Sequence, residues 1–310
     1  MMTTKNRMSI NIGALELANP VIPASGCFGI ELSPFTDLSL LGAIVPKTIF
    51  YEPRKGNPSP RTNETIGGML NSVGIPSKGV DSFLKSNLPD YKNIGPPIIV
   101  SIGGLSINSY FDLAERLNEV PEIAAIELNV SCPNLEDGGL EIGSNPKNIA
   151  KVVKGVVDRY SKPVITKLTP NVTSITDLAI AAESSGSTAI SLINTLGAMG
   201  IDNKTKRSAT GTLTSGLSGP AIRPIALKMV WQVSQQVTIP IIGMGGITNT
   251  STALEFIIAG ASVIGIGTVN FTNPNAMVEI IKGLESYVQT MGLNHILDIR
   301  GQLMLNSNNP

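Results

Sequence analysis

Polar side chains that could act on a small molecule follow several buried apolar runs of this chain, close to where each run ends. They are lysines, asparagines, hydroxyl residues and one cysteine: Ser25, Lys47, Thr48, Asn129, Cys132, Asn134, Lys167, Asn194 and Thr195. A lysine stabilises negative charge, an asparagine offers both a donor and an acceptor, and a thiolate can take up a proton. The only histidine, His295, lies near the C-terminus, so a proton acceptor at the ends of these runs must be another kind of side chain.

Two glycine-rich segments near the end of the chain indicate a phosphate site. They read GMGG at 243–246 and GIGT at 265–268. Glycines let backbone N–H groups approach phosphate oxygens, and the N-terminus of a following helix adds a favourable dipole. The segments follow the last two apolar runs, which is where many barrels bind phosphate.

Eight short apolar runs rich in valine and isoleucine predict the strands that position these side chains. Alternation with helices predicts a parallel sheet, and eight strands close a (β/α)8 TIM barrel whose site lies at the carboxyl ends of the strands. The alternative is an open doubly wound sheet, but no G-x-G-x-x-G fingerprint follows the first run. The expected strands are Pro20–Ser25, Ala43–Thr48, Pro97–Gly103, Ala125–Ser131, Pro163–Thr169, Ala189–Asn194, Pro240–Gly245 and Val263–Thr268. The expected helices are Asn108–Asn118, Pro146–Arg159, Ser174–Ser185, Pro220–Gln236, Thr252–Ala259 and Asn275–Met291.

Two connections, Ile49–Pro96 and Leu196–Gly219, are too long for simple crossovers. Long loops after barrel strands are usually functional, so we expect them as inserted loops at the C-terminal face of one barrel domain, residues 1–310.

Composition narrows the class of protein. Hydrophobic residues make up 42% and charged residues 15%, which is typical of a chain that buries a sizeable core. The 23 basic and 23 acidic side chains balance, so neither nucleic acid nor an anionic membrane is an expected partner. Two cysteines, Cys27 and Cys132, cannot supply a disulfide framework or the four thiolates of an ordinary iron–sulfur cluster. Cys27 is expected to pack near the barrel end. A polar N-terminus and the lack of a long apolar run predict a cytoplasmic protein, and no metal site is expected.

Four motifs carry a resemblance to a known family: ASGCFG at 24–29, NVSCPN at 129–134, GLSGPA at 216–221 and GMGG at 243–246. Together they resemble class 1 dihydroorotate dehydrogenases, closest to the B type, from about Ile10 to about Val288. The SCPN segment alone also occurs in the pyrimidine-reducing domain of dihydropyrimidine dehydrogenases.

The resemblance implies that FMN takes a hydride from dihydroorotate, giving orotate for pyrimidine biosynthesis, while Cys132 takes the proton as general base. It implies a substrate site in which asparagines hold the ring and the 69–74 loop receives the carboxylate: Lys47, Asn71, Ser72, Val73, Gly74, Ile75, Asn129, Asn134, Asn194 and Thr195. The implied FMN contacts are Ser25, Lys47, Thr48, Ser101, Asn129, Lys167, Ile193, Gly219, Gly245, Gly246, Gly267 and Thr268. Lys167 is expected beside the N1–O2 edge of the flavin, where a cation stabilises the reduced ring.

The chain departs from this pattern at two places. Ser101 stands where these relatives usually have asparagine, and residues 135–139 read LEDGG where relatives carry a basic residue or histidine.

The resemblance further implies a homodimer and an electron-transfer subunit carrying FAD and an iron–sulfur cluster, in a heterotetramer that reduces NAD. Fumarate as acceptor remains open. The alternative functions are a flavin barrel acting on another pyrimidine, a flavin-free lyase or isomerase with Lys167 as a Schiff base, and a non-enzymatic subunit.

Overall fold

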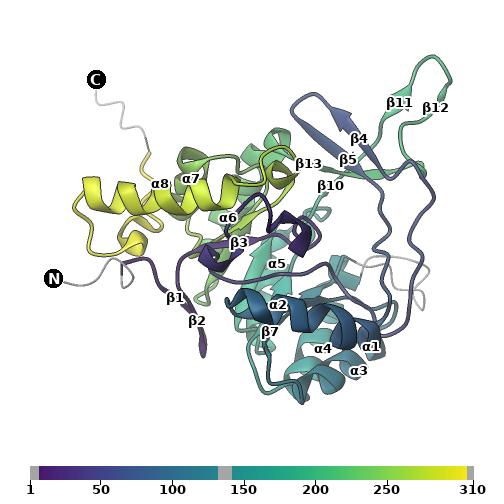
Figure 1. Ribbon diagram of the computed structural model, residues 1–310, viewed down its shortest axis with the longest axis horizontal. Coiled ribbons are helices and arrows are strands. Elements are labelled where there is room, and N and C mark those ends of the chain that lie inside the picture. The colour runs from purple at the N-terminus through teal and green to yellow at the C-terminus, as the bar shows by residue number, and fades with distance from the viewer. Residues whose placement is uncertain (1–6, 132–141, 306–310) are drawn as a thin grey trace.

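A curled parallel sheet forms the centre of the molecule (Figure 1). The computed structural model describes residues 7–131 and 142–305. Within them the sheet has seven strands in the order β3-β15-β14-β9-β8-β7-β6, each neighbouring pair parallel. The strands are β3 (Val21–Pro23), β6 (Ile98–Ile102), β7 (Ile123–Asn129), β8 (Val164–Lys167), β9 (Ala189–Leu192), β14 (Ile241–Met244) and β15 (Val263–Ile266).

The eighth expected strand, Ala43–Thr48, is irregular but lies where a barrel needs it. The Gly42 N–H donates to the Val21 carbonyl of β3 (2.8 Å), while Ile44 and Ile49 form parallel bridges with β6. Pro46 lies between those bridges and has no N–H, so it interrupts a regular ladder. The segment therefore connects the two edge strands, and the predicted α/β barrel is confirmed.

Helices cover the outside of the sheet (Figure 1). The six expected helices are present, each end within three residues of its predicted position. The described residues contain no helix long and apolar enough to cross a membrane. The helices are α1 (Val80–Ser82), α2 (Leu88–Ile94), α3 (Ile107–Asn118), α4 (Pro146–Val157), α5 (Ile175–Ser184), α6 (Arg223–Ser234), α7 (Thr250–Ile258) and α8 (Ala276–Thr290). Short 3-10 turns are η2 (Ile30–Leu32), η3 (Leu38–Leu40), η6 (Ile142–Ser144), η7 (Pro220–Ile222), η8 (Thr268–Phe271) and η9 (Ile296–Ile299), and η4 (Phe83–Asn87) is a π-helical turn between α1 and α2.

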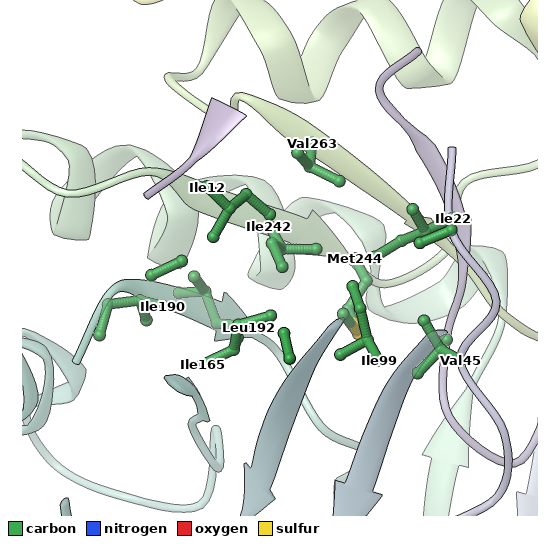
Figure 2. Close-up of a cluster of buried hydrophobic side chains, with 14 of the residues drawn as sticks. Ile12, Ile22, Val45, Ile99, Ile165, Ile190, Leu192, Ile242, Met244 and Val263 are labelled. Carbon is green, nitrogen blue, oxygen red and sulfur yellow. The ribbon is translucent and has the colours of Figure 1, made fainter. Parts of the chain in front are cut away.

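The barrel interior is filled with aliphatic side chains (Figure 2), including Ile22, Ile99, Ile165 and Ile242, all nearly inaccessible. A hairpin of β1 (Ile10–Ile12) and β2 (Leu15–Leu17) adds to this core, since Ile12 is fully buried. The packed interior makes the barrel a solid scaffold, so polar groups are accommodated at its ends.

The two long connections form one small antiparallel sheet. Its order is β10-β13-β5-β4, and Gly216 pairs with Asn71, 145 residues away in the chain. These strands are β4 (Thr62–Thr65), β5 (Gly68–Asn71), β10 (Leu196–Ala198) and β13 (Ser215–Ser218), and β11 (Ile201–Asp202) and β12 (Arg207–Ser208) make a separate hairpin (Figure 1). The expected inserted loops are therefore ordered strands, a pairing that the sequence did not predict.

Candidate active site

A cleft of two adjoining compartments lies at the carboxyl ends of the barrel strands. The larger has a volume of about 530 Å³ and the smaller about 300 Å³. These volumes suit small-molecule or cofactor sites. Ser25, Lys167 and Asn194 border both compartments, as do residues of the inserted sheet such as Met69 and Ser218. The site therefore combines strand ends with the inserted sheet.

Glycines shape the larger compartment. Gly219, Gly245 and Gly246 all have positive φ, and a Cβ on Gly246 would lie 2.8 Å from the Gly219 carbonyl oxygen. Among the described residues, the N–H groups of Gly246 and Gly267 have no hydrogen-bond partner. Backbone donors in a crowded glycine cradle suit phosphate oxygens. The same compartment is lined by Ser25, Lys167, Ile193, Gly219, Gly245, Gly246, Gly267 and Thr268, as the resemblance implied for the cofactor.

The cleft floor, defined here as Thr48, Asn129, Lys167 and Asn194, is a network of buried or half-buried side chains. Asn194 Nδ2 donates to Asn129 Oδ1 (3.2 Å), and Asn129 Nδ2 donates to Thr48 Oγ1 (3.3 Å). Lys167 Nζ donates to Ser25 Oγ (3.2 Å). Because these groups follow adjacent strands, the sheet fixes their spacing.

Ser101 lies behind this floor. It is fully buried on β6, its hydroxyl is 2.9 Å from Thr48 Oγ1, and it borders neither compartment. The structure therefore does not bring Ser101 to the cleft, because its short side chain ends at Thr48. Its contact with a cofactor stays a prediction.

The cleft wall, defined here as residues 71–75, continues from β5. Three carbonyl oxygens of the wall accept hydrogen bonds from residues 54 and 57. Asn57 Nδ2 donates to Ser72 O (3.1 Å), Asn57 N donates to Val73 O (3.1 Å), and Arg54 Nη2 donates to Gly74 O (3.3 Å). The N–H groups of residues 73–75 have no hydrogen-bond partner in the described part of the chain. Consecutive free N–H donors suit a carboxylate.

Not every predicted substrate contact borders the cleft. Lys47, Asn71, Val73 and Ile75 line the smaller compartment, whereas Ser72 and Gly74 line neither. Ser72 is buried, and its hydroxyl has no hydrogen-bond partner among the described residues. Cys132 and Asn134 lie outside the described residues.

Cys27 is a cleft residue that the sequence reasoning missed. It follows β3 and lines both compartments, where we expected it to pack near the barrel end. Burial raises the pKa of its thiol, while the charges of Lys167 and Lys47 lower it. Its position two residues after Ser25, at a strand end, was the available signal.

Positive charge gathers at the smaller compartment. Burial lowers the pKa of Lys47, the Arg61 cation lowers it further, and interaction with Cys27 raises it. His295 takes no part, since its ring caps η9 and its Nε2 lies 2.9 Å from the Ser9 carbonyl oxygen.

The fold and this cleft define an α/β barrel with a cofactor-sized glycine cradle beside a polar, cation-bordered pocket. A family model described as dihydroorotate dehydrogenase matches residues 7–288. The chain belongs to the dihydroorotate dehydrogenase family.

Curated relatives align over nearly their whole length. The chain is 47% identical over 298 residues to the dihydroorotate dehydrogenase B (NAD(+)) catalytic subunit of Bacteroides thetaiotaomicron, covering 96% of this chain and 98% of that protein. It is 47% identical over 299 residues to the subunit of the same name from Desulforamulus reducens, covering 96% and 98%. The subunit of that name from Geotalea uraniireducens is 43% identical over 302 residues, covering 97% and 99%.

Proposed function

We propose that this chain oxidises (S)-dihydroorotate to orotate in pyrimidine biosynthesis, with FMN as cofactor. The observation that carries the proposal is a glycine cradle and a polar pocket joined at Lys167, in a chain of this family. When bound, FMN would supply the acceptor for the hydride from C6 of the substrate. The Cys132 thiolate takes the proton from C5, and the two losses leave the C5–C6 double bond of orotate.

FMN fits the larger compartment by its chemistry. The free N–H groups of Gly246 and Gly267 would bind the phosphate, because phosphate oxygens need N–H donors that side chains do not cover. Lys167 borders both compartments and would stand beside the flavin ring, where its cation stabilises added negative charge.

The substrate ring would occupy the smaller compartment. Asn71, Asn129 and Asn194 offer amide groups that match a ring with alternating donors and acceptors. The free N–H groups of residues 73–75, together with Lys47, would bind the carboxylate. This preference for a carboxylate separates dihydroorotate from pyrimidines that lack one.

Anaerobic mixing of the purified, FMN-loaded chain with substrate tests the proposal. Dihydroorotate should bleach the flavin absorption band at about 450 nm at least as fast as the enzyme turns over. Dihydrouracil should leave the band unchanged. Bleaching by dihydrouracil alone would favour a different pyrimidine substrate. A chain that binds no flavin would favour the flavin-free lyase or isomerase.

We further propose that this chain acts in the cytoplasm as a homodimer that passes electrons to a separate subunit carrying FAD and an iron–sulfur cluster. The names of the relatives, catalytic subunits of NAD-linked enzymes, support a partner. Exposed apolar residues on the inserted strands and adjoining loops offer contact surface: Ile66, Met199, Ile201 and Leu213.

The chain purified alone should reduce artificial dyes but not NAD, and adding the partner subunit should confer NAD reduction in a heterotetramer. Steady NAD reduction by the chain alone would contradict the partner proposal. Brisk fumarate reduction would assign fumarate as the acceptor and leave the flavin site unchanged.

A further inference from the structure

Two charged side chains form an ion pair inside the barrel. Glu127 on β7 and Lys167 on β8 are only 3% and 4% exposed, and Glu127 Oε1 lies 3.9 Å from Lys167 Nζ. Charged residues are almost never buried to this extent without a partner. The pair is therefore a specific feature of the interior.

The pair is held at both ends. Ser191 on β9 donates its hydroxyl to Glu127 Oε2 (2.9 Å), and Lys167 Nζ donates to Ser25 Oγ at the cleft (3.2 Å). Lys167 borders both compartments, whereas Glu127 borders neither. The carboxylate thus lies beneath the ammonium, on the side away from the cleft.

The geometry leaves one carboxylate oxygen poorly satisfied. Glu127 Oε1 has no hydrogen-bond partner among the described residues, and 3.9 Å is too long for a hydrogen bond to Lys167. A buried ion pair of this kind adds little stability compared with apolar packing. A role in setting the charge of the site explains its presence better than a role in folding.

We propose that Glu127 is a positioning residue for Lys167: it holds the ammonium under the cleft and offsets part of its charge toward the flavin. The proposal rests on the proposed function for the flavin. A cation at the floor favours the reduced ring, and a carboxylate behind it moderates that effect. Glu127 would therefore tune the reduction potential without touching substrate or cofactor.

The midpoint potential of bound FMN tests this directly. Glu127→Gln keeps the acceptor for Ser191 but removes the negative charge, so the potential should rise, whereas Lys167→Met should lower it. The double variant should match Lys167→Met, because a lone buried carboxyl becomes neutral and no longer contributes charge. An unchanged potential in Glu127→Gln, or an equal rise in the Lys167→Met background, would overturn the proposal.

Thr166→Val is the matched control. Thr166 is fully buried on β8, next to Lys167, and its hydroxyl contacts Ser187 Oγ (2.9 Å) rather than the ion pair. Thr166→Val should lower the melting temperature and leave the midpoint potential of bound FMN unchanged. If Thr166→Val shifted the potential as much as Glu127→Gln, the effect of Glu127→Gln would come from a general disturbance of the core, and the proposal would fail.

A second readout needs no flavin. In flavin-free protein with Cys132→Ala, alkylation at varied pH reports the thiol of Cys27, which responds to the charge of Lys167. Glu127→Gln should shift the profile to lower pH, because the cation is no longer offset, and Lys167→Met should shift it to higher pH. Coincident profiles for Glu127→Gln and the parent protein would count against the ion pair, even if the chain bound no flavin.

Melting temperatures test the ion pair independently of the potential, and they apply even if the single variants fold poorly. Removing one partner of a buried pair is more damaging than removing both. Each single variant should therefore melt below the double variant. If the fall in melting temperature of the double variant equalled the sum of the falls in the two single variants, Glu127 and Lys167 would act independently and the ion pair would be contradicted.

Discussion

The floor and the wall of the cleft are held by different kinds of contact. On the floor, side chains that follow neighbouring barrel strands bind one another, as Asn194 does with Asn129. In the wall, the carbonyls of residues 72–74 are held by residues 54 and 57, from another part of the same inserted connection. The barrel sheet holds the floor rigid, whereas only a few hydrogen bonds between loops hold the wall in place. We therefore expect floor substitutions to alter chemistry and charge, and wall substitutions to alter substrate binding alone.

The largest effect is expected at Cys132, which follows the same strand as the floor residue Asn129. Cys132→Ala should keep FMN but lose turnover by about 10²–10⁴-fold, the usual cost of removing a general base. Stopped-flow flavin reduction at pH 8 measures it. Cys132→Ser should retain a remnant that improves at higher pH, since a hydroxyl is a weaker acid than a thiol. Near-parental reduction by Cys132→Ala would remove the residue from the mechanism.

The next effect concerns the charge of Lys47. Its pKa is lowered by burial and by Arg61, so the ammonium loses its proton at a lower pH than an ordinary lysine does. Affinity for anionic orotate should be full below that lowered pKa and fall as pH rises through it. The loss should reach roughly tenfold or more, since a hydrogen bond to a charged group contributes about 1.5–3 kcal/mol. Titration of flavin absorbance with orotate from pH 7 to 10 measures it, and Lys47→Met should show no such alkaline decline.

A smaller effect is expected in the wall. Asn57→Ala removes the hydrogen bond from Nδ2 to Ser72 O. The KM for dihydroorotate should rise about fivefold, corresponding to about 1 kcal/mol, with kcat unchanged. The control is Asn63→Ala on β4, whose side chain makes no hydrogen bond within the described residues. A fall in kcat at unchanged KM would show that the wall shares the role of the floor.

The smallest effect is expected at Ser101. Its hydroxyl contacts Thr48 and borders neither compartment. Ser101→Ala should lower the free energy of unfolding by about 1 kcal/mol, the net contribution of one buried hydrogen bond, while FMN affinity stays the same. Urea unfolding and fluorimetric FMN titration measure the two. A weaker FMN affinity at unchanged stability would favour the direct cofactor contact implied by the resemblance.

Much of the site could be predicted because barrel strands end at one face. Lys167, Asn129 and Asn194 follow separate runs, and parallel pairing alone brings them together. Cys27 shows the limit of this reasoning. A cysteine after a strand suits packing or a cleft equally well, and only the neighbouring side chains decide which applies.

The sequence by itself determined the order of the eight barrel strands and of six helices, the glycine cradle and the chemistry of the strand ends, because these depend on local periodicity and on residue type. The tertiary structure alone decided how Ile49–Pro96 and Leu196–Gly219 pair, and that Ser101 stops behind Thr48. It also decided that Glu127 lies under Lys167. Such contacts join residues far apart in the chain or depend on side-chain reach. No local pattern encodes either, so only the folded arrangement could settle them.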